Sequence, residues 1–275
     1  MTDWAAALDA ASRARVTLVI GPSDTGKTTL TTRLAAALAA GVPVAIVDAD
    51  LGQSDIGPPT TIGLGRARPD LARPGDAELL GLEFVGATTP VANLRLTARA
   101  TRALVDRALA AGFAHVIVDT CGMVQGGLAR AVRRTQIELV APDLLIVLQR
   151  RDECEHLVAG YEAAGRPAVL RLPPLAGVVR RTQADRRRHR ERALAAYFAA
   201  ATAVRLDLAR VVVEPPGAVA DALDVLVGLR DAGGVTLGIG RVTAVHTVAR
   251  ALSVVTPVEA AGIAAVVMGR ERYRG

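Results

Sequence analysis

The chain has 275 residues, of which 51% are hydrophobic and only 3% are aromatic, and its formal net charge is +6. This length suits one large α/β domain with a small appendage, and the core must consist mainly of Ala, Val and Leu. The sequence has no uncharged apolar run of about 18 residues and no basic-then-apolar start, so we expect a cytoplasmic protein that neither enters a membrane nor carries a signal peptide. Cys121 and Cys154 form no metal-binding or disulfide pattern.

The stretch from Val16 to Thr29 predicts a phosphate-binding loop. Val16 to Ile20 is a short apolar strand, and the next eight residues, Gly21 to Thr28, match G-x-x-x-x-G-K-[ST]. A helix from Thr29 to Ala40 follows, and Gly41 ends it. In such a loop the backbone N–H groups and the start of the helix bind phosphates, and the Thr hydroxyl is offered to Mg²⁺.

Lys27 is the single lysine among the 33 basic residues of the chain. A compact ammonium group fits inside a phosphate loop, whereas the wide guanidinium plane of arginine does not. The one position where the sequence departs from arginine is therefore the position that must meet the β- and γ-phosphates.

A second apolar strand, Val42 to Val47, precedes Asp48 and Asp50. Parallel strands joined by helices bring their carboxyl ends to the same sheet edge, so these carboxylates should lie beside the phosphate loop. Residues two apart on an extended strand face opposite sides. We therefore expect one of them to serve the metal and the other to face an acceptor.

The segment from Gly57 to Gly75 has no clear period and predicts loops with short pieces of structure. Strands are expected at Leu82 to Val85 and Ala114 to Asp119, with a helix from Leu94 to Ala111 between them. An apolar strand that ends in Asp downstream of a phosphate loop commonly holds Mg²⁺ through its water shell, so Asp119 is a metal candidate, with a turn or cap residue as the alternative.

Further helices are predicted at Arg130 to Val140 and Glu153 to Ala164, and strands at Leu144 to Leu148 and Ala168 to Leu172. A strongly basic segment, 180–192, follows and continues into an apolar stretch with Leu194, Tyr197 and Phe198. This pattern favours a hinged basic helix beside the site over a merely solvated helix. We expect this helix and its hinge, at about residues 178–200, to form a lid over the site.

From residue 204 onward, short strands with turn signals replace the βα pattern. Strands are expected at residues 211–213, 225–229, 235–239, 242–248 and 252–255, with a hairpin turn at Asp231 to Gly234. The predicted architecture is an α/β P-loop NTPase domain over 1–203, with a mostly parallel sheet flanked by helices, plus a small C-terminal β domain over 204–275.

The ordered set of motifs resembles the polynucleotide 5′-hydroxyl kinase family, which includes the kinases of pre-mRNA cleavage and of pre-rRNA processing and shorter microbial members. The phosphate loop is one part of the likeness. The other parts are Asp48 to Gln53 followed by Pro58-Pro59, the segments Thr120 to Gly122 and Phe84 to Pro90, the arginine pair Arg186 and Arg190, and the 226–240 region.

The resemblance implies transfer of a phosphoryl group from ATP or GTP to the 5′-hydroxyl of RNA or DNA. Asp50 would be the base, and Thr120 to Gly122 a clasp over the loop lysine and the phosphates. Met123 stands where the family commonly has a Trp that could stack on a base. The implied catalytic residues are Lys27, Asp50, Arg186 and Arg190. The implied nucleotide-binding residues are Gly21, Pro22, Ser23, Asp24, Thr25, Gly26, Lys27, Thr28, Thr29, Thr120 and Gly122. The implied Mg²⁺ residues are Thr28, Asp48 and Asp119, and the substrate residues Gln53, Met123 and Arg187.

Two other functions fit the same loop. The chain could be a GTPase or ATPase switch or maturation factor, although those that read guanine through Asn-Lys-x-Asp need a second lysine, which this sequence lacks. It could also be a non-catalytic subunit that holds ATP and binds nucleic acid. Protein partners are not predicted from the sequence.

Overall fold

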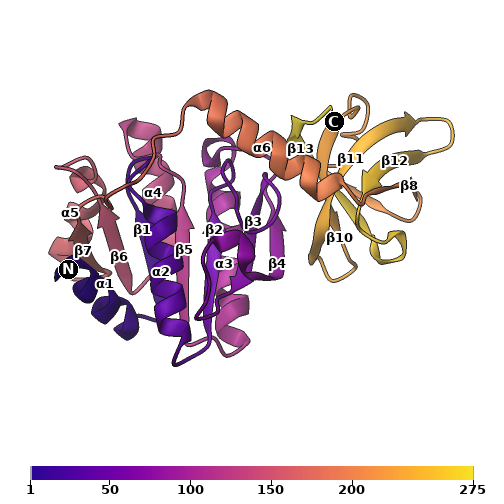
Figure 1. Cartoon of the computed structure of the whole chain (residues 1–275). Helices are drawn as coiled ribbons and strands as arrows, with labels where there is room; N and C mark the ends of the chain where they lie inside the picture. Colours follow the sequence, from indigo (N-terminus) through magenta and orange to yellow (C-terminus); the bar gives the residue numbers. More distant parts are fainter. Residues whose placement is uncertain (1, 275) are drawn as a thin grey trace.

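A computed structural model describes residues 2–274 (Figure 1). Its helices, within those residues, are α1 (Thr2–Arg13), α2 (Lys27–Ala39), α3 (Leu94–Ala110), α4 (Gly126–Val140), α5 (Glu155–Ala164) and α6 (Gln183–Phe198). Short 3₁₀ turns occur at η1 (Pro74–Asp76), η2 (Pro90–Ala92) and η3 (Ala260–Gly262). None of the helices in this described range is long and apolar enough to span a lipid bilayer.

The strands of the first two thirds of the chain are β1 (Val16–Ile20), β2 (Val44–Ala49), β3 (Thr61–Arg66), β4 (Glu78–Phe84), β5 (His115–Thr120), β6 (Leu144–Leu148) and β7 (Ala168–Leu172). The later strands are β8 (Thr202–Asp207), β9 (Val212–Glu214), β10 (Val225–Arg230), β11 (Thr236–His246), β12 (Ala251–Thr256) and β13 (Ala265–Arg272).

The first part of the sheet is mostly parallel. In the order β7-β6-β1-β5-β2 all neighbours are parallel, and β3 and β4 continue the sheet antiparallel. The α/β fold with a mostly parallel sheet is thus confirmed. Because the parallel strands end at one edge, the phosphate loop after β1, Asp50 after β2 and the clasp after β5 meet there.

Each face of the parallel sheet carries its own core, because side chains on a strand alternate between faces. On one face, Val19 and Ile46 pack with Leu30 and Leu34 of α2. On the other face, Leu18, Ile20 and Val47 pack against α3, α4 and α5. The central strands are buried along their whole length, which explains their continuous apolar sequences.

The C-terminal strands form a β unit, which we define as residues 202–274. Its core contains Val227, Leu229, Val254 and Val266. Strand β11 pairs antiparallel with β4, so this unit continues the same hydrogen-bonded sheet. Helix α6 crosses the top of the molecule and ends against the C-terminal strands (Figure 1).

The structure corrects several sequence-based expectations. In the segment 57–75, where we expected loops with short pieces of structure, residues 61–66 form strand β3, which was not located from the sequence. Strands β8 and β13 were not predicted. Gly63 obscured the β3 pattern, yet a side chain is excluded there because a Cβ would lie 1.9 Å from the Ile56 carbonyl oxygen. The two strands expected at 235–239 and 242–248 are one strand, β11. Gly240 inside it makes room for Val254, since a Cβ would lie 2.2 Å from that side chain.

Candidate active site

The phosphate loop is fixed by backbone packing. Gly26 has φ of 90° and precedes α2, a left-handed conformation that glycine adopts without strain. A Cβ on Gly21 would lie 2.3 Å from the Leu148 carbonyl oxygen at the end of β6. Within the loop, the Thr25 hydroxyl donates to the Pro22 carbonyl at 2.8 Å. The loop therefore has its shape before any ligand is bound.

Lys27 is nearly buried inside this loop, with 7% of its surface exposed. Its Nζ donates to the Pro22 carbonyl oxygen at 2.8 Å. Burial lowers the pKa of Lys27, and the nearby charges of Asp119 and Asp50 oppose that shift. Among residues 2–274 the Lys27 ammonium has no direct ion pair, so it is well suited to an anion that arrives with a ligand.

Thr28 and Asp119 form a pair of oxygen donors beside Lys27. The Thr28 hydroxyl donates to Oδ2 of Asp119 at 2.5 Å, and the Thr120 amide donates to Oδ1 at 2.9 Å. Burial raises the pKa of Asp119 to about 6, although Lys27 and Thr28 favour its charged form. Hydroxyl and carboxylate oxygens are the ligands that Mg²⁺ prefers, so this pair fits that ion.

The two aspartates at the end of β2, Asp48 within the strand and Asp50 just after it, differ in their surroundings. Asp48 is buried, and its carboxylate accepts hydrogen bonds from the backbone amides of Asp50, Asp55 and Ile56. Burial, followed by the charge of Asp119, raises the pKa of Asp48 well above its ordinary value. This carboxylate is used to shape the following loop and does not line the cavity of the site.

Asp50 is half-buried and lines the cavity. Its Oδ1 accepts hydrogen bonds from the amides of Gly52 and Gln53, each at 3.1 Å. These bonds within its own loop hold the carboxylate at the cavity. Its negative charge acts on Lys27 and favours a higher pKa of that lysine. Asp48, expected from the sequence as a residue for Mg²⁺, thus binds backbone amides, and Asp50 alone of the two lines the cavity.

The segment Thr120 to Gly122 lies directly against the phosphate loop. A Cβ on Gly122 would lie 2.2 Å from Oγ and 2.4 Å from the backbone N of Ser23, so only glycine fits. The Thr120 hydroxyl donates to the Val19 carbonyl of β1 at 2.8 Å. These contacts anchor the segment beside the phosphate loop.

A buried arginine holds this segment from behind. Arg133 of α4 is only 1% exposed and donates to the carbonyl oxygens of Cys121 and Met123 and to the side chain of Gln136. In a trans peptide the N–H points away from the C=O. Because Arg133 binds the Cys121 carbonyl oxygen, the Gly122 amide of the same peptide bond points away from Arg133.

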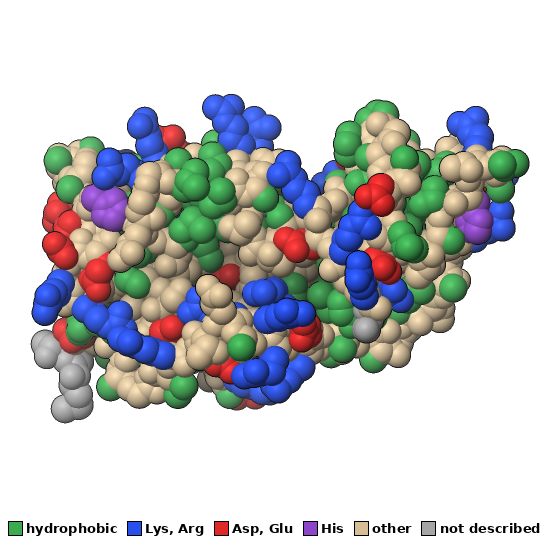
Figure 2. All heavy atoms as spheres, turned by 90° about the horizontal axis from the view of Figure 1, so that it is seen from above, with side chains coloured by type: hydrophobic (Ala, Val, Ile, Leu, Met, Phe, Trp, Pro, Cys, Tyr) green, Lys and Arg blue, Asp and Glu red, His purple; other side chains and the backbone are tan. Residues whose placement is uncertain are grey.

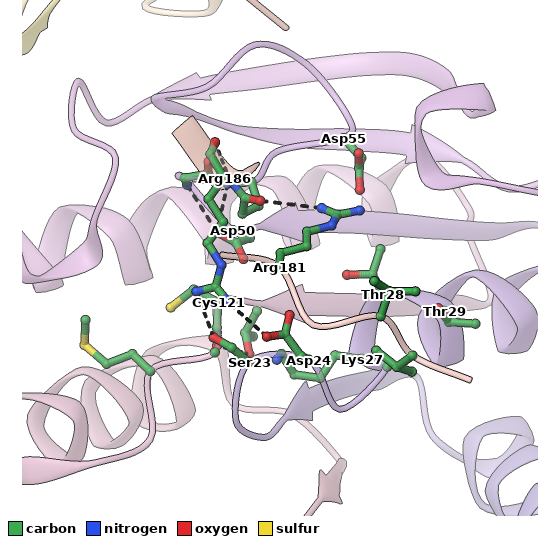
Figure 3. Close-up of a pocket in the computed structure, with 18 of the residues that line it drawn as sticks. Ser23, Asp24, Lys27, Thr28, Thr29, Asp50, Asp55, Cys121, Arg181 and Arg186 are labelled. Carbon is green, nitrogen blue, oxygen red and sulfur yellow. Dashed lines mark hydrogen bonds and ion pairs between the residues drawn. The ribbon is translucent and has the colours of Figure 1, made fainter. Parts of the chain in front are cut away.

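The basic helix α6 closes the site from above. Arg186 is half-buried and reaches the phosphate loop, where it donates to the Ser23 hydroxyl at 3.3 Å and to Asp24 Oδ2 at 3.1 Å (Figure 3). The Gln53 side chain donates to the Arg186 carbonyl at 3.2 Å, and Arg181 donates to Gln53 at 3.5 Å. The lid and the loop after β2 are therefore joined by polar contacts.

The other arginines of α6 have different positions. Arg190 lines the cavity, whereas Arg187 is exposed, pairs with Glu191 at 2.8 Å within its own helix and does not line the cavity. Arg188 likewise pairs with Asp185 at 2.5 Å. Seen from above, basic side chains are spread over this face with acidic side chains between them (Figure 2).

These elements line one cavity of about 720 Å³, which opens to the solvent and has a size typical of small-molecule sites. Of the residues predicted from the sequence, it is lined by Ser23, Asp24, Gly26, Lys27, Thr28, Thr29, Asp50, Gln53, Thr120, Gly122, Met123, Arg186 and Arg190. Gly21, Pro22, Thr25, Asp48, Asp119 and Arg187 lie outside this lining.

Several lining residues were not identified from the sequence. They include Arg33, Asp55, Thr88, Leu175 and Arg181. Thr88 belongs to the Phe84 to Pro90 segment that had already suggested the family, which was a usable signal. Asp55 faces His189 of α6 at 3.8 Å, a contact between distant segments that no local pattern indicates.

The strand, loop and helix around Lys27, set in a mostly parallel sheet, define a P-loop protein. A model of the family described as mRNA cleavage and polyadenylation factor CLP1 P-loop matches residues 21–200, and the chain belongs to this family. The family indicated by the ordered motifs is thus confirmed.

Several curated proteins are similar in sequence. A polyribonucleotide 5′-hydroxyl-kinase of Pyrococcus furiosus is 35% identical over 198 residues, which cover 71% of this chain and 54% of that protein. One of Methanocaldococcus jannaschii is 35% identical over 156 residues, covering 56% of this chain and 43% of that protein. The polyribonucleotide 5′-hydroxyl-kinase Clp1 of Danio rerio is 30% identical over 194 residues, covering 66% and 42%. The chain spans about half the length of these relatives or less.

Solved structures share the fold. The structure of wild-type Clp1p in complex with Pcf11p superposes with a TM-score of 0.72 at 16% identity, covering 94% of this chain and 74% of that chain. At this identity the likeness concerns the fold alone.

Proposed function

We propose that this protein transfers the γ-phosphoryl group of ATP or GTP to the 5′-hydroxyl end of a polynucleotide, RNA or DNA. The observation that carries the proposal is the shared cavity, in which the phosphate loop with Lys27 faces the carboxylate of Asp50 under the lid residue Arg186. Six curated relatives with the name polyribonucleotide 5′-hydroxyl-kinase support the same reaction.

Residues Gly21 to Thr29 hold the triphosphate in this proposal. The loop amides and the ammonium of Lys27 bind the β- and γ-phosphates. The clasp, whose Thr120 amide is bonded to Asp119, contacts them through Gly122. We assign Thr28 and Asp119 as the residues that hold Mg²⁺, which when bound neutralises the charge of the phosphate oxygens. Asp48, with its oxygens bonded to backbone amides, positions the loop that carries Asp50.

On the acceptor side, Asp50 orients the 5′-hydroxyl and takes its proton. The hydroxyl oxygen forms the new bond to the γ-phosphorus while the bond to the β–γ bridging oxygen breaks, and the nucleoside diphosphate leaves. Gln53 and Met123, which line the cavity, contact the end of the polynucleotide. Arg187, exposed on the outer side of α6, would contact the strand only beyond the cavity.

Arg186 and Arg190 act as the lid arginines. In the structure Arg186 is bonded to Ser23 and Asp24 of the phosphate loop, a position that supports a contact between its guanidinium and the transferred phosphoryl group. An arginine in such a position is worth about 10³ to 10⁵ in rate. All of these side chains come from residues 1–203, which we propose as the kinase domain, with residues 178–200 as its lid. Residues 204–275 would form a small β-rich C-terminal domain.

We also propose that the protein acts in the cytoplasm. Both cysteines are free, and Cys121 is partly accessible at the site, as expected in a reducing compartment.

The test is transfer of labelled γ-phosphate from ATP and from GTP to oligonucleotides with a 5′-hydroxyl, both RNA and DNA, with Mg²⁺. The proposal expects labelled oligonucleotide from at least one pairing, and none from a 5′-phosphorylated control. Hydrolysis of the nucleotide without any labelled oligonucleotide would instead indicate a switch or maturation NTPase.

A further inference from the structure

The C-terminal β unit contacts the walls of the cavity at two separate places. At the first, Leu194 of α6 packs with Leu226 and Ile239, and the Tyr197 hydroxyl accepts a hydrogen bond from the Ile239 amide at 2.8 Å. The carboxyl end of the lid helix is therefore anchored in this unit. The second contact concerns the loop that follows β4.

Strand β13 holds the loop Val85 to Pro90. The Arg270 amide donates to the Gly86 carbonyl at 2.7 Å. Gly86, with φ of 74°, lies against Gly269, since a Cβ on Gly86 would be 2.7 Å from the Gly269 Cα. The backbones of the loop and of β13 thus approach as closely as two glycines allow.

Glu271 makes the specific contact with this loop. Its Oε1 accepts hydrogen bonds from the backbone amide of Thr88 at 3.1 Å and from the Thr88 hydroxyl at 2.9 Å. Hydrogen bonds to a charged acceptor are stronger than those between neutral groups. Glu271 is half-buried, so these bonds are partly shielded from water.

Thr88 in turn supports the loop of Asp50. A Cβ on Gly52 would lie 2.8 Å from the Thr88 carbonyl oxygen, so the two backbones are in direct contact. The amide of the same Gly52 donates to Oδ1 of Asp50. A continuous series of contacts therefore joins Glu271 of the C-terminal unit to the acceptor carboxylate.

We call the loops 50–53 and 85–90, together with helix α6, the acceptor wall of the cavity. We propose that Glu271 is a positioning residue for Asp50, and that the C-terminal β unit positions this wall through Glu271, Thr88 and Gly52. The unit itself contributes no residue to the lining of the cavity. It contacts two parts of that wall, the loop 85–90 and the lid helix, while the phosphate loop rests on the parallel sheet. The inference rests on the proposed kinase function for the role of Asp50.

The experiment compares Glu271→Ala and Glu271→Gln with Glu259→Ala, which removes an exposed carboxylate of the same unit. Three quantities are measured on the full chain: kcat for transfer to a 5′-hydroxyl oligonucleotide, the Kd for ATP by calorimetry, and amide hydrogen exchange at residues 50–53 and 86–90. Glutamine retains an acceptor oxygen for Thr88, so Glu271→Gln tests rescue of the contact.

We expect Glu271→Ala to lower kcat by about 10-fold or more, because small displacements of a reacting group are costly. The Kd for ATP should change by no more than about twofold, as for an ordinary surface substitution. Exchange at Gly52, Gln53 and Thr88 should become faster, Glu271→Gln should recover most of kcat, and Glu259→Ala should match the wild type.

Two results would overturn the proposal: a Glu271→Ala protein with the kcat and amide exchange of Glu259→Ala, or one in which ATP affinity falls as much as kcat, which would indicate a general structural role. If the wild type transfers no phosphate at all, the kinase function fails. The exchange at Gly52 and Gln53 in Glu271→Ala then still decides whether the C-terminal unit positions the Asp50 loop.

Discussion

The two walls of the cavity are held by different kinds of contact. The phosphate wall is built from backbone that touches backbone, as where Gly21 meets Leu148 and Gly122 meets Ser23, and from buried side chains such as Lys27 and Arg133. The acceptor wall consists of loops and a helix that come from distant parts of the chain. Single side-chain hydrogen bonds join these parts, in addition to close backbone approaches such as that of Gly52 to Thr88. We infer that nucleotide binding depends on the first wall and phosphoryl transfer on both.

This difference is sharpest at Lys27. Lys27→Arg keeps the positive charge but replaces a compact ammonium by a wide guanidinium. The loop leaves little room for the wider group, because Nζ of Lys27 is 2.8 Å from the Pro22 carbonyl oxygen. We expect transfer to fall by about 10³-fold or more, since the lysine contact to the phosphates is lost. Labelled-phosphate transfer measures the effect, and circular dichroism should show an intact fold. Transfer within about tenfold of the wild type would show that the loop tolerates a guanidinium.

The acceptor wall is tested by two arginines one residue apart. Arg186→Ala removes the group bonded to Ser23 and Asp24, and we expect kcat to fall by about 10³-fold, at the lower end for a phosphoryl-transfer arginine, while ATP still binds. Arg187→Ala is the matched control for kcat, because its side chain is exposed and paired with Glu191 outside the cavity. Its proposed contact with the strand should therefore affect KM alone. Steady-state kinetics with an oligonucleotide and calorimetry with ATP separate the two quantities. Equal effects of both substitutions would contradict the assigned lid contact.

On the phosphate wall, Gly122→Ala should weaken nucleotide binding. A Cβ at this position meets the backbone of Ser23 at 2.4 Å, so the clasp must move away from the loop. We expect the Kd for ATP to rise by about 10- to 100-fold, equivalent to about 1.4 to 2.7 kcal/mol. Gly127→Ala is the control, since a Cβ there has nothing within 4 Å and the residue lies in helix α4. Unchanged ATP affinity in Gly122→Ala would show that the clasp is not part of the phosphate wall.

The smallest expected effect is a difference in reactivity between the two cysteine thiols. Burial raises the pKa of Cys154 to about 11, so below that pH its thiol remains protonated and unreactive in the folded protein. Cys121 is partly exposed and lines the cavity. At pH 8 an alkylating reagent should therefore modify Cys121 alone, and saturating ATP should slow this reaction. Mass spectrometry of the labelled protein measures both, and modification of Cys154 at a similar rate would mean that the core behind the site opens.

The same difference between the walls decided what the sequence could predict. Gly21 to Thr28 is one contiguous pattern whose glycines, lysine and threonine each have a local physical reason, and the strands around it are continuous apolar runs. The acceptor wall depends on contacts between residues such as Gln53 and Arg186, or Thr88 and Glu271, which are far apart in the chain. No periodicity or spacing encodes such pairs. Strand β3 was missed because its glycines serve packing against Ile56 rather than a turn.

The most direct test of the account compares the wild type with Asp50→Asn in two assays, binding of ATP and transfer of labelled γ-phosphate to 5′-hydroxyl RNA and DNA. Asparagine retains an oxygen for the amides of Gly52 and Gln53 but cannot take a proton from the hydroxyl. The account predicts that the wild type labels the oligonucleotide and that Asp50→Asn binds ATP with unchanged affinity yet loses transfer by about 10² to 10⁴-fold. Transfer by Asp50→Asn at the wild-type rate, or no labelled oligonucleotide with the wild type, would contradict it.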